Sequence, residues 1–416
     1  MDRLVGQVTI RGLEMTTFAV ALPVVARRNH RALWRAYALL APLVLFLLLT
    51  FVGPIATLLW RGVADSELPD ALPQTALALK QWDGRSAPDE RLLRPFSADL
   101  QQVSAKELAG LARRLSYEAP QLRAMLATAK RGAANLDGSA QGFAALDPRW
   151  LENETWQSFK RASGPVGSYH LLSALDLKRD YNQGIVGKGE EGLYRSILLR
   201  TFAIAAATTL ICVLLAFPLC AYLDRRTPRT RNLLLLLILL PFWTSILVRT
   251  TAWMVLLQDQ GVVNTSLLYL GLIDSPLRLL YNRFGVILAL VHVMLPFMVF
   301  PLLAAMQSSN RLLVQAAYSM GARPLFTFFR VYLPQVLPGL AAGALMVFIV
   351  TLGFYITPAL IGGPGDQMIS YYIAQFTTGT LNWGLASALG IVLLTVTTLL
   401  YLIQARLARG RSQGRH

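Results

Sequence analysis

Charged residues are scarce in this 416-residue chain: Asp, Glu, Lys and Arg make up 15% of it, against 54% for hydrophobic residues. A soluble domain of this length usually contains about a quarter charged residues, so the composition argues against a single soluble domain. Cysteine is nearly absent. Cys212 and Cys220 lie in one apolar run, about two helical turns apart and too distant for a disulfide, so we interpret both as small core residues.

Motifs for catalysis and metal binding are also missing. The four histidines are scattered without metal-ligand spacing, and no nucleophile stands in a recognisable arrangement with a base. The phosphate-binding loop of P-loop ATPases is absent, because Gly187-Lys188 lacks the upstream glycine and position 182 is asparagine. The sequence therefore predicts no metal site, no cofactor, no catalytic residue and no ATP hydrolysis on this chain.

Long apolar runs are what the chain has in abundance. A helix needs about 20 apolar residues to cross a bilayer. Six runs qualify, at residues 36–60, 197–223, 232–257, 285–306, 337–358 and 383–405. We therefore predict an all-α multi-pass membrane protein with six transmembrane helices.

The net charge of +16 is distributed unevenly. Residues 61–195 hold 18 Lys and Arg against 17 Asp and Glu, whereas the rest of the chain holds 21 against 6. The excess arginines gather in alternate short segments, at 27–35, 225–231, 311–330 and 406–415. The connectors 258–284 and 359–382 carry only Arg278 and Arg283. This positive-inside pattern differs from a nucleic-acid-binding face and predicts that both termini are cytoplasmic.

The same pattern places a large hydrophilic insertion on the opposite, periplasmic side. The predicted order is a cytoplasmic segment at 1–35, the first span at 36–60, the insertion at 61–195, a transmembrane core at 196–408 and a cytoplasmic tail at 409–416.

Apolar residues at helical spacing predict a mainly helical insertion, with a modest core from Trp82, Trp150, Trp156 and Phe159. We favour a cap that stabilises the assembly over a docking surface for a solute-binding protein.

The connector between the fourth and fifth runs, within 309–338, has the pattern of a helix, a turn and a second helix. Ser309 or Asn310 is suited to cap the first helix, Gly321 to end it in the left-handed conformation, and Pro324 to begin the second. A cytoplasmic loop with this many apolar side chains must bury them against a partner.

This connector resembles the coupling loop of permease subunits in bacterial ATP-binding-cassette (ABC) importers, which has the pattern E-A-A, three residues, G, nine residues and I-x-L-P. The spacing is kept, with Gln replacing Glu and Val replacing Ile. The resemblance implies that the ATPase-coupling residues are Gln315, Ala316, Ala317, Gly321, Val331, Leu333 and Pro334. Pro334 and Pro338 are expected to break the second helix before the fifth span.

The resemblance covers about 195–408 and implies a type I importer permease, with a five-span core and an extra N-terminal span. The implied partners are two ATP-binding cassette ATPase subunits, a second permease subunit, a periplasmic solute-binding protein and the lipid of the bacterial inner membrane. Residues 240–264 and 352–369 are similar to spermidine/putrescine-type permeases, which implies polyamine transport.

Ionisable groups at membrane depth are functional hypotheses, and a polyamine is bound by carboxylates and aromatic faces. The substrate-pathway candidates are Trp243, Arg249, Trp253, Asp259, Tyr355 and Asp366. For each, helix packing or solvation is the competing interpretation. Because the substrate is a cation, Arg249 is expected to anchor a gate or snorkel to the interface rather than to bind it.

Three alternatives stay open. The first is a permease of the same class for another solute, such as an opine or an amino-acid derivative. The second is an ATPase-independent secondary transporter, although the inverted repeats typical of that class are not evident. The third is a membrane-anchored sensor or enzyme whose working part is 61–195.

Overall fold

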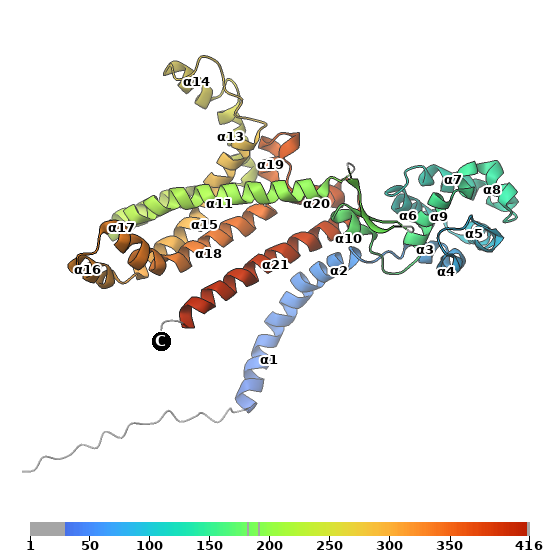
Figure 1. Cartoon of the computed structure of the whole chain (residues 1–416), viewed down its shortest axis with the longest axis horizontal. Coiled ribbons are helices and arrows are strands. Elements are labelled where there is room, and N and C mark those ends of the chain that lie inside the picture. The colour runs from blue at the N-terminus through green and yellow to red at the C-terminus, as the bar shows by residue number, and fades with distance from the viewer. Residues whose placement is uncertain (1–29, 181–182, 190–191, 414–416) are drawn as a thin grey trace, which may run out of the picture. The chain divides into compact units, whose positions relative to one another are not determined.

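The computed structural model describes residues 30–180, 183–189 and 192–413, and helices dominate this part of the chain (Figure 1). The chain divides into two compact units, residues 1–56 and 57–416. Most of the predicted cytoplasmic segment 1–35 lies outside the described residues, as do the last residues of the predicted tail.

The described residues of the first unit belong to one long apolar helix. α1 (His30–Leu47) continues through the π-helical turn η1 (Leu48–Val52) into α2 (Gly53–Arg61). The wider π turn directly precedes Pro54, whose ring would clash with a carbonyl one turn earlier in a regular helix. The segment Tyr37–Arg61 has 25 residues, enough to cross a bilayer, as predicted for the first span.

The insertion is a small helical domain followed by a β-hairpin. Its helices are α3 (Glu67–Ala71), α4 (Pro73–Gln81), α5 (Glu90–Gln102), α6 (Ala105–Ser116), α7 (Leu122–Gly132), η2 (Ala133–Asn135), α8 (Ala140–Leu146), η3 (Pro148–Leu151), α9 (Asn153–Arg161) and α10 (Tyr169–Ala174). The hairpin pairs β1 (Leu177–Asp180) antiparallel with β2 (Gly184–Gly187), with Leu177 opposite Gly187. The expectation of a mainly helical insertion is confirmed for the described residues.

Aromatic side chains fill the core of this domain. Trp150, Trp156 and Phe159 are fully buried, as predicted, whereas Trp82 is only partly buried at the edge. Phe96, which the sequence analysis did not single out, lies in the middle, with ring centroids of four other aromatic residues 5.1–5.6 Å away. Each fully buried ring stabilises the fold by roughly 1.5–3 kcal/mol relative to an exposed one.

A buried ion-pair network ties the start of the insertion to α6 and α9. The Arg114 guanidinium donates to Asp65 over 2.8 Å (Nε to Oδ1) and 2.5 Å (Nη2 to Oδ2), and to Glu118 Oε1 over 3.0 Å. Arg161 Nε donates to Glu118 Oε2 over 2.6 Å. Because these carboxylates come from separate segments, the network fixes the chain leaving α2 against the helical domain.

Three long helices form the centre of the membrane core: α11 (Tyr194–Asp224), α15 (Arg283–Ser308) and α18 (Leu333–Gly353). A Cβ added at Gly339 would lie 2.3 Å from the Ala305 Cβ, so this glycine allows α18 to approach α15 closely. Around them lie α12 (Pro228–Leu239), η5 (Leu240–Trp243), α13 (Ile246–Leu257), α14 (Val262–Tyr269), α16 (Arg311–Ser319), α17 (Pro324–Thr327), the π-helical η6 (Phe328–Tyr332), α19 (Ile356–Ile361), η7 (Pro364–Asp366), α20 (Ile369–Thr378) and α21 (Trp383–Gln413).

The prediction of one continuous third span at 232–257 is wrong. The structure divides it into two helical segments, Pro228–Trp243 and Ile246–Tyr269, bent by 97° at the break. Pro241 lies in the 3-10 turn before the break, and the side chain of Ser245 caps α13 by accepting from the Val248 N–H over 3.2 Å. Composition did not reveal the break because the residues around it are as apolar as a span.

The expected start of the fifth span is also wrong. A continuous apolar helix runs from Pro324 to Gly353, through η6, so Pro334 and Pro338 do not break it. Pro334 lies in the first turn of α18, directly after the π-helical segment, where its missing N–H is tolerated. The helix also ends at Gly353 rather than at residue 358, because the chain turns into the short α19.

Candidate functional site

The loop α16–α17 is held in one geometry by its own hydrogen bonds. Asn310 caps α16, because its side chain accepts from the Leu312 N–H over 3.0 Å. At the other end Gly321 has φ +79°, the Gly321 N–H donates to Tyr318 O over 2.9 Å, and the Ala322 N–H donates to Ala317 O over 3.0 Å. This Schellman arrangement satisfies the last carbonyls of the helix and turns the chain sharply. The predicted left-handed glycine stop is confirmed.

The loop presents apolar side chains to solvent. Met320 is 82% exposed and Leu325 is 74% exposed, and Leu312 and Phe326 are exposed as well. Several exposed apolar side chains on one loop indicate a contact with another molecule. The surface is formed by both helices, since the turn at Gly321 brings their exposed faces to the same loop.

Two polar contacts attach this loop to the neighbouring spans, and neither was predicted from the sequence. Arg311 Nη2 donates to Asp224 Oδ2 over 2.7 Å, which links the start of α16 to the end of α11. The Asn310 N–H donates to Gln335 Oε1 over 2.8 Å, which links the same point to α18. The acidic Asp224 beside the arginine-rich connector was a usable signal, since it is the only carboxylate there. A movement of the loop would therefore pull on both helices.

The predicted coupling residues divide into two groups. Gln315, Ala316, Gly321 and Pro334 are exposed. Ala317 is the buried residue of α16, and Val331 and Leu333 are half-buried where η6 joins α18. The first group is accessible on the surface of the loop, and the second packs the loop against the core.

Arg249 lies at the break of the third span. Its guanidinium donates to Pro241 O, and to Thr244 O over 2.9 Å, so it caps the last carbonyls of the turn before the break. Backbone carbonyls at membrane depth must be satisfied internally. These contacts hold the Arg249 guanidinium against the carbonyls of the bend, and its proposed part in a gate stays a prediction.

The other predicted pathway residues do not form one cluster. Trp253 Nε1 donates to His292 Nδ1 over 3.2 Å, and His292 was not predicted as a site residue. Asp366 is buried, accepts from Arg283 Nε over 3.1 Å and from the Gly363 N–H over 3.3 Å.

Trp243, Asp259 and Tyr355 are exposed. In the described part of the chain, no hydrogen bond, ion pair or ring contact joins the six candidates to one another.

Comparison with known proteins agrees with this geometry. Residues 216–413 match the family described as "Binding-protein-dependent transport system inner membrane component". The spermidine/putrescine transport system permease protein PotB of Escherichia coli strain K12 is 35% identical over 217 residues, which are 52% of this chain and 79% of that protein. The chain belongs to this permease family.

Other proteins are also similar to this chain. The corresponding PotB of Haemophilus influenzae is 34% identical over 214 residues, 51% of this chain and 75% of that protein. The inner membrane ABC transporter permease protein YdcU of E. coli is 37% identical over 183 residues, 41% of this chain and 58% of that protein. A solved bacterial alginate ABC transporter aligns with 54% of this chain and 83% of its own, at 21% identity and a TM-score of 0.43.

Family membership fixes the class of activity. The chain is a multi-pass inner membrane permease subunit of an ABC importer, and it is not an enzyme. The family match begins at residue 216, so the insertion at 61–195 lies outside it.

Proposed function

We propose that this permease carries putrescine or spermidine across the inner membrane, and that the loop α16–α17 docks on a separate ATPase subunit. The observation that carries the proposal is the rigid, apolar and exposed turn around Gly321. It combines three properties that a transmitted movement needs: a fixed shape, a surface for a partner, and attachments to two spans.

The attachments give the coupling its physical basis. The Arg311–Asp224 pair joins the loop to α11, and the Asn310–Gln335 bond joins it to α18. Both helices pack on α15 in the centre of the core. A displacement of the loop by the ATPase is therefore transmitted to the central helices through short, directional contacts rather than through flexible chain.

The polyamine assignment rests on the relatives. Two PotB proteins whose names state spermidine/putrescine transport match half of this chain at 34% and 35% identity. Trp243, Trp253 and Tyr355 supply aromatic faces for ammonium groups, and Asp259 supplies an exposed carboxylate. We keep these four as the substrate-pathway candidates, whereas Asp366 forms an ion pair with Arg283.

Two further assignments complete the proposal. A second permease subunit encloses the pathway together with this chain, and exposed apolar residues on the bent third span, among them Tyr269 at 91% exposure, offer it a surface. The arginine-rich connectors, with the loop α16–α17, lie in the cytoplasm together with both termini.

We propose that the insertion is a periplasmic cap. Its aromatic core and its buried Arg114 network make it a rigid body. α10 then packs on the core through a shared apolar cluster that contains Ala174, Ile197 and Leu389. These features are those of a structural module fixed to the spans.

The test is uptake by the complete importer, expressed in cells that lack other polyamine uptake. Labelled putrescine or spermidine should accumulate, and opines and amino acids should not compete. Tyr355→Ala should raise KM, whereas the matched variant Tyr355→Phe keeps the aromatic face and should leave KM nearly unchanged. If an opine competes for uptake and polyamines do not, the polyamine assignment is wrong, and the assignment to the permease class still holds.

A further inference from the structure

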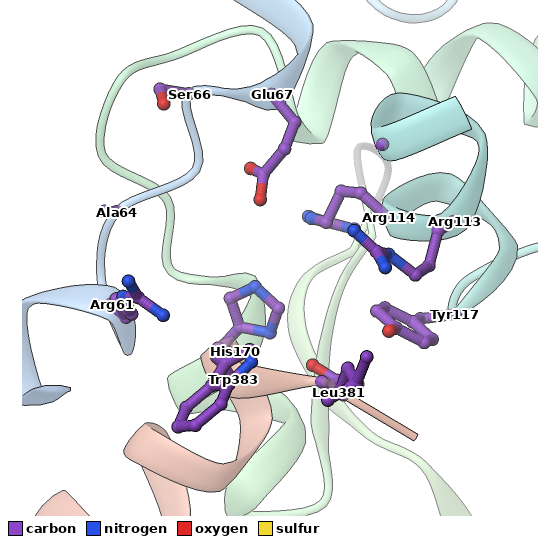
Figure 2. Close-up of a pocket in the computed structure, with 13 residues that line it drawn as sticks. Arg61, Ala64, Ser66, Glu67, Arg113, Arg114, Tyr117, His170, Leu381 and Trp383 are labelled. Atoms are coloured by element: carbon purple, nitrogen blue, oxygen red, sulfur yellow. The ribbon is translucent and has the colours of Figure 1, made fainter. Parts of the chain in front are cut away.

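A polar cavity lies where the insertion meets the ends of two membrane spans. It has a volume of about 240 Å³ and is lined by residues of the insertion and by the segment at the start of α21 (Figure 2). Arg61 is the last residue of the span Tyr37–Arg61, and Trp383 is the first residue of the span Trp383–Arg406. Because span ends mark the boundary between hydrocarbon and water, we expect a cavity beside the ends of two spans to lie at the level of the lipid headgroups.

Charges of both signs face this cavity. Figure 2 shows Arg61 on one side, Arg113 on the other, and the Glu67 carboxylate turned toward the space between them. Among the described residues none of these three forms an ion pair. By contrast the neighbouring Arg114 is already neutralised by Asp65 and Glu118. The cavity thus has two guanidinium groups and one carboxylate that form no ion pair in the described part of the chain.

The imidazole of His170 is the buried polar part of the lining. It is 5% exposed, and its Nδ1 has no hydrogen-bond partner in the described part of the chain. Its other edge is pressed on Gly384, where an added Cβ would lie 2.3 Å from Nε2. A polar group drawn in beside the ring, with a small tilt of the imidazole, would supply the missing partner. Buried polar groups normally have one.

We propose that this cavity binds the headgroup of a zwitterionic phospholipid, phosphatidylethanolamine. The phosphate lies between Arg61 and Arg113, since guanidinium groups bind phosphate through paired charge-assisted hydrogen bonds. The ammonium group lies against Glu67. A volume of 240 Å³ holds about eight water-sized groups, which is the size of a phosphoethanolamine moiety.

The charge pattern excludes two other occupants. Two guanidinium groups would repel a polyamine, so the cavity is not a second site for a cationic solute. A purely anionic headgroup would leave Glu67 unpaired beside a phosphate, which costs binding energy. The Trp383 ring, with the Arg61 guanidinium 5.4 Å from its centroid, is typical of side chains at the headgroup level.

The test uses the full-length permease, purified in detergent and stripped of lipid. Binding of phosphatidylethanolamine, phosphatidylglycerol and phosphatidylcholine is measured by native mass spectrometry, with phosphoethanolamine and inorganic phosphate as free competitors. Phosphatidylethanolamine should bind most tightly. Arg61→Gln and Glu67→Gln should each weaken it by about tenfold, because each removes a charged hydrogen-bonding partner.

The matched control is Arg278→Gln, which removes an exposed arginine in a connector outside the cavity and should leave lipid binding unchanged. Equal weakening by Arg278→Gln would show non-specific charge attraction and overturn the site. A preference for phosphatidylglycerol, or no effect of Glu67→Gln, would overturn the zwitterionic assignment. Displacement by inorganic phosphate as effective as by phosphoethanolamine would identify a free-anion site instead.

Discussion

Protonation of His170 is expected to destabilise the insertion at mildly acidic pH. Burial, reinforced by the nearby Arg114 guanidinium, lowers the pKa of His170 to about 3. An unfolded chain has a histidine pKa of about 6.5. Below pH 6.5 the unfolded state therefore binds a proton that the folded state does not bind. The stability contributed by the neutral imidazole is present above this pH and is lost as the pH falls.

The size of the effect follows from these two values. Between pH 7 and pH 5 the folded His170 stays neutral, and the unfolded one becomes almost fully protonated. Linkage then gives a loss of about 2 kcal/mol in the free energy of unfolding. If the insertion unfolds as a unit, this corresponds to about 4–8 °C in its unfolding midpoint.

Fluorescence of the buried Trp150 and Trp156 follows unfolding of the insertion in the purified, lipid-free permease. The assay compares the pH dependence of wild type with that of His170→Gln, which has no titrating group but keeps a polar side chain of similar reach. Carboxylates contribute equally to the pH dependence of stability in the two proteins, so their effect cancels in the comparison. The variant should lose about 2 kcal/mol less between pH 7 and pH 5. Identical slopes for the two proteins would refute the reasoning, whatever their absolute midpoints.

Two more perturbations address the turn and the ion network. Gly321→Val forces a β-branched residue into φ +79°, which costs about 1–2 kcal/mol of conformational energy. This variant should reduce uptake at normal membrane levels, whereas Gly321→Asn should retain most of the uptake. Equal uptake by both variants would contradict a need for this turn. Asp65→Asn leaves the buried Arg114 with only one carboxylate and should lower the unfolding free energy of the insertion by roughly 3 kcal/mol, at the low end for a broken buried pair. Glu90→Gln, which removes an exposed pair, should change it by less than about 0.5 kcal/mol, and a similar cost for both would refute the distinction.

The sequence predicted the parts of the fold that depend on local pattern. The six apolar stretches follow from hydrophobic length, and the stop at Gly321 follows from the rarity of left-handed backbone in other residues. The break in the third span could not be predicted, because it depends on Arg249 reaching back to the carbonyls of Pro241 and Thr244. Arg249 can reach these carbonyls only when the chain is already bent, so the sequence pattern does not indicate the contact.

Contacts between distant segments were missed for the same reason. Asp224 and Arg311 are far apart in the sequence and meet only when α11 and α16 are in place. Asp366 looked like an accessible carboxylate in an outward connector, whereas the fold pairs it with Arg283. The loop α16–α17 was recognisable because its helix–glycine–helix pattern is local. The side chains proposed for the substrate pathway come from separate helices, so the sequence alone did not show their relative positions.

Docking of the apolar turn between α16 and α17 on an ATPase subunit is open to direct test. The most direct measurement is co-purification of the ATPase with affinity-tagged permease carrying Met320→Glu or Met320→Leu. Met320 is 82% exposed, so neither substitution disturbs the folded core. We expect Met320→Leu to retain the ATPase as wild type does and Met320→Glu to lose most of it at equal permease yield. Full retention of the ATPase by Met320→Glu would contradict the claim.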